Sequence, residues 1–175
     1  MSRKRFQPRN KTVNKNFKIY SINSAGIKSK LLSFETVLKN IQPSIWTMQE
    51  TKLKSNETIK CDSLSEFCVY YLNRQNSQGG GVALGVRKSF PSTLISEGDD
   101  DTEAISVKVF VKQFAIRVVT AYGPQENALK EKKEKFWEFV EKEANEAELE
   151  GDGFVLQMDG NLHAGRGLIK EDPNI

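Results

Sequence analysis

A chain of 175 residues is long enough to bury one substantial core without disulfides, so a single domain is the first expectation. Hydrophobic residues make up 38% of the sequence, and no apolar run approaches the roughly 18 residues that a membrane-spanning helix needs; this excludes a membrane protein. The N-terminus lacks the apolar core of a secretory signal and the two cysteines make no disulfide framework, so we expect a nuclear or cytoplasmic protein.

The net charge of +3 is unevenly distributed along the chain. Residues 1–18 hold seven Lys or Arg and no acid, whereas the remainder has 19 basic against 23 acidic residues. We therefore predict a basic arm over residues 1–16 and one folded domain over residues 17–175. The arm suits nucleic-acid binding by phosphate neutralisation or a nuclear address, and a disordered solubilising tail explains its composition equally well.

The first predicted elements form a strand, helix, strand unit. Residues 17–23 place apolar side chains on both faces, which predicts a strand buried on both sides. Residues 28–41 carry apolar side chains at helical spacing, and Pro43 ends the pattern. Residues 44–50 form an apolar run that turns polar at its end, as expected of a second strand. Such a unit implies a right-handed crossover between parallel strands, and hence the α/β class.

Two antiparallel hairpins are predicted next. Residues 67–72 and 79–87 flank a polar turn, and residues 104–111 and 114–121 are rich in β-branched side chains and separated by two residues. The three glycines at 79–81 neither precede a Gly-Lys-Ser/Thr sequence nor open a helix. A bulge or close backbone packing is therefore favoured over a phosphate-binding loop.

Residues 129–149 form the longest helical pattern, with its charged residues expected on a solvated face. The apolar stripe predicted for the buried side consists of Trp137, Val140, Ala144 and Ala147. Glycines at 151 and 153 end this helix, and the run that begins at Phe154 predicts a last strand.

Four predicted strands change abruptly from apolar to polar side chains at their carboxyl ends. These polar residues are Asn23, Gln49 with Glu50, Tyr122, and Asp159 with Asn161. Ligands of open α/β sheets bind at that edge. Taken alone, the Asp-Gly-Asn sequence at 159–161 is better explained as a simple turn, but together with the other strand ends it favours a site.

The residue types at these strand ends suit metal-assisted hydrolysis of a phosphoester. Glu50 and Asp159 supply carboxylates, Asn23 and Asn161 supply neutral oxygens, and Tyr122 supplies a phenolic donor. Hard oxygen ligands favour Mg²⁺ or Mn²⁺ over zinc. One carboxylate can fix the ion that polarises a phosphoryl oxygen, while an aspartate oriented by an asparagine accepts a proton from water.

Other chemistries have little support in this sequence. Cys61, Cys68 and His163 are too few to build a zinc site without carboxylates. No Gly-x-Ser-x-Gly elbow occurs, and a single histidine gives no support to a serine or cysteine nucleophile. We expect Cys68 in the core, and His163 either in a surface loop or in contact with substrate.

Five motifs in order resemble the endonuclease/exonuclease/phosphatase superfamily, most closely the apurinic/apyrimidinic-endonuclease-like domain of non-LTR retrotransposons. They are SINSAGI (21–27), MQET (48–51), GGGVALGV (79–86), AYGP (121–124) and MDGNLHAG (158–165). The resemblance implies a four-layered α/β sandwich, of which this chain resembles the N-terminal portion. The family's C-terminal part, which closes with a Ser-Asp-His motif, has no counterpart in these 175 residues.

The resemblance also implies roles for single residues. Glu50 would be the main ligand of Mg²⁺, with Mn²⁺ as an alternative, and Asn23 would lie beside it. Tyr122 would contact the scissile phosphate, and Asp159 with Asn161 would position or activate the nucleophile; Asn161, Tyr122 and His163 form the predicted substrate contacts.

The implied activity is nicking of DNA by a Mg²⁺-dependent phosphodiesterase, the endonuclease of a non-LTR retrotransposon polyprotein, and we expect this activity to be impaired in the shortened chain, which has no counterpart of the Ser-Asp-His motif. Implied partners are DNA, a reverse transcriptase domain encoded downstream, and the C-terminal half of the fold. Two alternatives stay open, namely an inactive nucleic-acid-binding fragment and a phosphatase or ribonuclease of the same superfamily.

Overall fold

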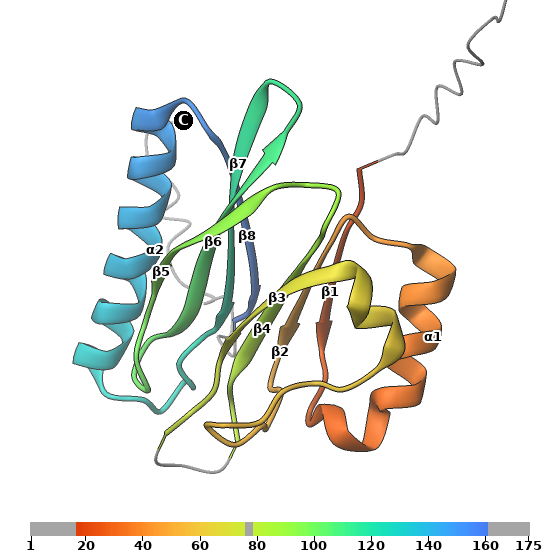
Figure 1. Cartoon of the computed structure of the whole chain (residues 1–175). Coiled ribbons are helices and arrows are strands. Elements are labelled where there is room, and N and C mark those ends of the chain that lie inside the picture. The colour runs from red at the N-terminus through yellow and green to blue at the C-terminus, as the bar shows by residue number, and fades with distance from the viewer. Residues whose placement is uncertain (1–16, 76–78, 161–175) are drawn as a thin grey trace, which may run out of the picture.

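Two four-stranded sheets face each other, and a long helix covers the outer face of each (Figure 1). The computed structural model describes residues 17–75 and 79–160. The predicted arm at 1–16 and the last part of the predicted domain, 161–175, lie outside the described residues.

The first sheet has the strand order β1-β2-β4-β3 and the second the order β5-β6-β7-β8. The strands are β1 (Ile19–Asn23), β2 (Ile45–Gln49), β3 (Phe67–Leu72), β4 (Val82–Arg87), β5 (Ser92–Glu97), β6 (Glu103–Val111), β7 (Phe114–Tyr122) and β8 (Gly153–Asp159). The helices are α1 (Leu31–Ile41) and α2 (Lys130–Glu150), with short 3-10 turns η1 (Ile27–Lys30) and η2 (Asp62–Glu66). None of the helices described is long and apolar enough to cross a membrane.

The pairing of the strands confirms the α/β class and the predicted hairpins. β1 pairs parallel with β2, and β7 pairs parallel with β8. β3 with β4 and β6 with β7 are antiparallel, as the sequence predicts. β5 was not predicted from the sequence, because Leu94 and Ile95 are exposed and the strand shows no clean alternation of apolar and polar side chains.

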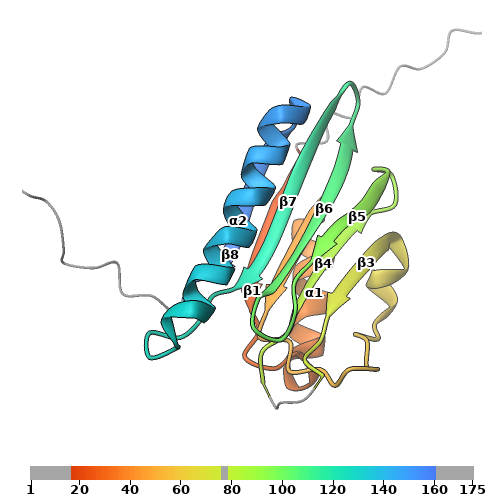
Figure 2. The same cartoon turned by 90° about the vertical axis from the view of Figure 1, so that its left-hand side faces the viewer.

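Three apolar layers stabilise this arrangement. Between the sheets lie side chains of both, including Ile45, Leu84, Ile105, Val107 and Val118. Phe34 and Leu38 of α1 pack on Trp46 and Met48 outside the first sheet, whereas Phe136 and Val140 of α2 pack on Ala104 and Val119 outside the second. Figure 2 shows α2 lying along the second sheet. The chain therefore folds as helix, sheet, sheet, helix, which confirms the sandwich architecture.

Two predictions about burial are wrong. β1 is half-buried, and Ser21 and Asn23 are exposed, because β1 is the outermost strand of its sheet and pairs with β2 alone among the described strands. Cys68 is exposed because it lies on β3, the other outermost strand of that sheet.

The buried side of α2 also differs from the prediction. It consists of Phe136, Val140, Glu143 and Ala147, whereas Trp137 is 38% exposed. A fully buried glutamate replaces the expected apolar contact, so the charged residues of α2 do not all lie on a solvated face. The reason lies on the neighbouring strand β7, which presents a buried arginine to this helix.

Arg117 of β7 forms a cluster of ion pairs with α2. Its Nη1 lies 2.9 Å from Glu143 Oε2 and 2.9 Å from Glu146 Oε2, and its Nη2 lies 3.2 Å from Glu150 Oε1. The side chains of Arg117 and Glu143 are each 1% exposed. Glu143 also accepts a hydrogen bond of 2.6 Å from Ser96 Oγ. These contacts fix α2 along the outer face of the second sheet.

Arg117→Met should lower the free energy of unfolding by about 3–5 kcal/mol, because Glu143 would keep a buried charge without its partner. Urea denaturation measures the change. Adding Glu143→Met should recover most of the loss. The control is Lys130→Gln in the exposed pair with Glu134, which should leave stability unchanged; equal effects of Arg117→Met and Lys130→Gln would contradict the buried cluster.

Candidate active site

The space between the sheets changes from apolar to polar toward one edge. In β1, β2, β7 and β8, three alternate residues on the inner face begin with an aliphatic side chain and continue with two polar ones. The four series are Ile19, Ser21, Asn23; Ile45, Thr47, Gln49; Val118, Thr120, Tyr122; and Val155, Gln157, Asp159. Parallel register aligns the series within each sheet. The strand ends therefore bring four polar side chains to one edge of the sandwich.

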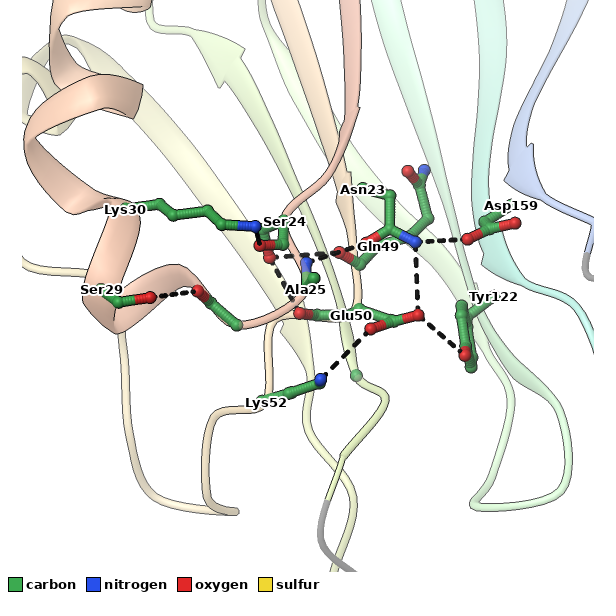
Figure 3. A network of polar contacts seen from close by, with 12 residues as sticks. Asn23, Ser24, Ala25, Ser29, Lys30, Gln49, Glu50, Lys52, Tyr122 and Asp159 are labelled. Carbon is green, nitrogen blue, oxygen red and sulfur yellow. Dashed lines mark hydrogen bonds and ion pairs between the residues drawn. The ribbon is translucent and has the colours of Figure 1, made fainter.

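Asn23, Glu50, Tyr122 and Asp159 form one hydrogen-bond network at that edge (Figure 3). The Nδ2 group of Asn23 donates to Glu50 Oε1 at 3.3 Å and also to Asp159 Oδ2. Tyr122 Oη donates to Glu50 Oε1 at 3.0 Å. Asn23 Oδ1 accepts the backbone N–H of Ala25 at 2.8 Å, which fixes the orientation of the amide. A single amide group thus bridges carboxylates that come from different sheets.

Glu50 follows β2 in a left-handed backbone conformation, with φ of 51°. That conformation is uncommon outside glycine and persists where surrounding contacts hold it. Here the carbonyl of Glu50 accepts the N–H of Gly26 at 2.8 Å and the hydroxyl of Ser24 at 2.8 Å. The loop after β1 therefore holds the backbone that carries the Glu50 carboxylate.

The glycine segment holds the same loop from its other side. The N–H groups of Thr51 and Lys52 donate to the carbonyls of Gly81 and Gly80 at 3.1 and 2.9 Å. A Cβ on Gly81, whose φ is 82°, would lie 2.6 Å from Thr51 Oγ1. The N–H of Gly81 also donates to the buried carboxylate of Glu103 at 2.5 Å. These contacts agree with the prediction that the glycines serve close backbone packing.

The network keeps Glu50 ionised. Partial burial raises the pKa of its carboxyl, but hydrogen bonds from Asn23 and Tyr122 and the ion pair with Lys52 Nζ at 3.4 Å lower it by more. The pKa therefore lies below the ordinary value of 4.5. The stability that this carboxylate contributes is present above pH 4.5 and is lost as the pH falls through the lowered pKa.

Gln49 lies beneath the network and joins the two sheets. Its side chain is buried, with 2% exposure. Its Nε2 group donates to Thr120 Oγ1 at 3.0 Å and to the Gln157 carbonyl at 3.3 Å, and it lies 3.5 Å from Ser21 Oγ. Gln49 was predicted as a strand-end residue, but its burial and its bonds across the sheets were not.

The side chains at this edge fit a hard divalent cation. Two carboxylates, of Glu50 and Asp159, accept hydrogen bonds from one amide, that of Asn23, whose Oδ1 atom accepts the Ala25 N–H. No group of three or more His, Cys, Asp or Glu side chains suited to a metal occurs in the described ranges. Mg²⁺ commonly binds one or two carboxylates and takes its other ligands from water and substrate. The oxygen donors described here therefore favour Mg²⁺ or Mn²⁺ over zinc.

Of the predicted site residues, the structure brings Asn23, Glu50, Tyr122 and Asp159 together, and their chemical roles stay predictions. Asn161 and His163 lie outside the described residues. Sequence reasoning did not include Lys52, whose ammonium group is paired with Glu50. The position of Lys52, two residues after Glu50, is the feature of the sequence that could have suggested this ion pair.

Two facing mixed sheets with helices outside them are also the fold of several solved structures. Neither a family model nor a curated protein matches the sequence of this chain. The similarity is one of structure, and it extends over most of the chain.

Three solved structures illustrate it. TDP2 from Caenorhabditis elegans has a TM-score of 0.64 and 17% identity, over 84% of this chain and 48% of that one. The 3′ phosphatase NExo from Neisseria, bound to a product DNA hairpin, has a TM-score of 0.62 and 20% identity, over 86% and 60%. An AP endonuclease from Archaeoglobus fulgidus has a TM-score of 0.53 and 20% identity, over 82% and 57%. The chain thus spans about half to three fifths of these proteins.

Tyr122→Phe should raise the pKa of the Glu50 carboxyl toward 4.5, because it removes one hydrogen bond to the ionised form. Carbon-13 NMR of the labelled carboxyl during a pH titration measures this. Tyr70→Phe is the control, since the Tyr70 hydroxyl contacts Ser92 away from the site. An unchanged Glu50 titration in Tyr122→Phe would contradict the network described here.

Proposed function

We propose that this chain carries the active-site wall of a Mg²⁺-dependent phosphodiesterase that nicks DNA. The observation that supports this most directly is the convergence of Glu50 and Asp159 on the amide of Asn23, with the Tyr122 hydroxyl beside them. Paired carboxylates with a neutral amide and a phenol are suited to phosphoester hydrolysis by water.

Each side chain has a separate task in this proposal. Glu50, with Asn23 beside it, would hold Mg²⁺, which when bound supplies positive charge to a phosphoryl oxygen. Asp159 accepts the proton of the attacking water as the water oxygen bonds to phosphorus; the bond from phosphorus to the leaving ester oxygen breaks, and that oxygen takes a proton from solvent. The Tyr122 hydroxyl, which donates to Glu50 in this structure, would turn to donate its hydrogen bond to the scissile phosphate. The Asn23 amide keeps the two carboxylates at a fixed separation.

We further propose the retrotransposon role, as the DNA-nicking domain of a non-LTR element. The five ordered motifs support this assignment, and they include the Glu50 and Asp159 segments. The proposed partners are DNA, a reverse transcriptase encoded downstream, and further strands of the fold, in the nucleus or cytoplasm. A neighbour with this fold is bound to product DNA, which agrees with DNA as substrate.

A cleft lined by three lysines also supports a polyanionic substrate. Residues 24–30 and 50–60 carry five lysines and two glutamates, although the chain beyond residue 18 has more acids than bases. The cleft has a volume of about 730 Å³. Its exposed rim includes Lys28, Lys54 and Lys60 over a floor of buried apolar side chains, and Glu57 of the same cleft pairs with Lys28 at 2.7 Å. Phosphates of the strand beside the nick would lie along this rim.

Glu50→Gln and Asp159→Asn should each abolish Mg²⁺-dependent nicking of supercoiled plasmid, because each removes a carboxylate without changing the shape of the side chain. The assay compares Mg²⁺ with EDTA, in the 175-residue chain and in the same chain extended by its downstream coding sequence.

The matched control for nicking is Glu148→Gln, an exposed glutamate on α2, which should nick like the unmodified protein. Undiminished nicking by Glu50→Gln or Asp159→Asn would rule out the proposed mechanism. DNA binding without any nicking in both chain lengths would favour the alternative of a binding module.

Replacing Lys28, Lys54 and Lys60 together by Gln should weaken DNA binding in EDTA and flatten its salt dependence. Each lost phosphate contact lowers the slope of log K against log salt by about 0.9, so the triple variant should lose about 2 to 3. Fluorescence anisotropy at several salt concentrations measures the slope.

The control for the salt dependence is the matched triple replacement of Lys130, Lys135 and Lys142, which are exposed on α2. It removes the same total charge away from the cleft. Equal slopes in the two triple variants would show that the cleft does not contact DNA.

A further inference from the structure

We infer that Gln49 is a positioning residue, which sets the separation of the Glu50 and Asp159 carboxylates by tying the two sheets together beneath them. The effect on catalysis rests on the proposed function. The hydrogen bonds that join Gln49 to the opposite sheet are a feature of the fold.

The bonds of Gln49 reach the strands that carry the site residues. Its amide donates across the sandwich to Thr120 on β7 and to the Gln157 carbonyl on β8. Thr120 precedes Tyr122 by two residues, and Gln157 precedes Asp159 by two. Alternate residues of a strand share a face and lie roughly 6–7 Å apart. Gln49 is therefore hydrogen-bonded to the opposite sheet at positions two residues before the side chains that form the network.

The tie is local, because the inner face of β2 offers no second bond of this kind. Thr47 lies two residues earlier on the same face and is fully buried, but its hydroxyl has no hydrogen-bond partner in the part of the chain that is described. Deeper in the sandwich, apolar side chains such as Ile45 and Val118 fill the space between the sheets. Non-directional apolar contact holds the sheets together there, whereas directional bonds set their spacing at the edge.

The consequence for the site follows from how the carboxylates are held. Glu50 is joined to β2, and Asp159 ends β8 in the other sheet, so their separation changes whenever the sheets shift at this edge. Asn23 bridges the two carboxylates but lies on the outermost strand of its sheet and is exposed. The buried hydrogen bonds of Gln49 therefore keep the Glu50 and Asp159 carboxylates at the separation that the exposed Asn23 amide bridges. Removing outer-shell contacts of this kind typically costs about 10- to 100-fold in metal affinity or activity.

Gln49→Met tests the inference, since methionine has a similar length and cannot donate the two bonds across the sheets. Thr120→Val removes the side-chain acceptor, one of the two acceptors in the opposite sheet, and Thr120→Ser keeps it. Thr47→Val is the control on the same face. Calorimetry with Mn²⁺ alone should give a dissociation constant raised about 10-fold or more for Gln49→Met and Thr120→Val. Thr120→Ser and Thr47→Val should bind like the unmodified chain.

A second measurement separates this inference from the proposed function. Exchange of the Asn23 side-chain amide protons, followed by NMR without metal, reports the bridge between the carboxylates directly. Exchange should be faster in Gln49→Met and Thr120→Val than in Thr47→Val, whether or not the chain nicks DNA. A folded Gln49→Met variant with unchanged Asn23 exchange overturns the inference. Failure to bind Mn²⁺ in the unmodified chain counts against the proposed function only.

Discussion

The site depends on two parallel strand pairs, one in each sheet, that end at the same edge. β1 aligns Asn23 with Gln49 on β2, and β7 aligns Tyr122 with Asp159 on β8. In an antiparallel pair, neighbouring strands end at opposite edges, and the same residues would be separated by the length of the strands. The two strand pairs face each other across one apolar core. Their polar ends therefore form a single cluster.

The contacts that stabilise the fold and the residues of the candidate site lie in different parts of the interior. Apolar layers and the buried Arg117 and Glu143 pair hold the helices and sheets together away from the edge. At the edge, two carboxylates lie close together, which is unfavourable unless donors or cations compensate them. Asn23, Tyr122 and Lys52 provide that compensation for Glu50. Glu50 also has a left-handed backbone, so local order at the site depends on contacts from the neighbouring loops.

Much of this arrangement could be predicted from the sequence because strand ends are visible in it. The change from apolar to polar side chains is enough to predict that Asn23, Glu50, Tyr122 and Asp159 gather at one edge. The inner-face series, such as Ile45, Thr47 and Gln49, carries the same information in finer detail, since alternate residues share a face. Those small polar residues were the missed signal for a bond between the sheets.

The errors arose where long-range partners decide burial. The side of α2 that carries Trp137 is more hydrophobic than the side that carries Glu143. Helical periodicity alone therefore predicts that the Trp137 side is buried. Arg117, which is distant in sequence, reverses that choice by supplying a buried positive charge. In the same way, the position of β1 at the outside of its sheet leaves Ser21 exposed, although its own sequence suits a central strand. Neither the burial of Glu143 nor the exposure of Ser21 can be predicted from the neighbouring residues in the sequence alone.

Asp159 and Glu50 are held to the fold in different ways. Asp159 ends β8, an outermost strand, whereas Glu50 is held by the loops on both sides of it. Local opening is easiest where few buried contacts hold a segment, so the end of β8 would open before β2 and β7 separate. Such an opening removes Asp159 while the bond between Tyr122 and Glu50 remains. The bond from Gln49 to the Gln157 carbonyl opposes it, and completeness of the site therefore depends on how well β8 is held to the first sheet.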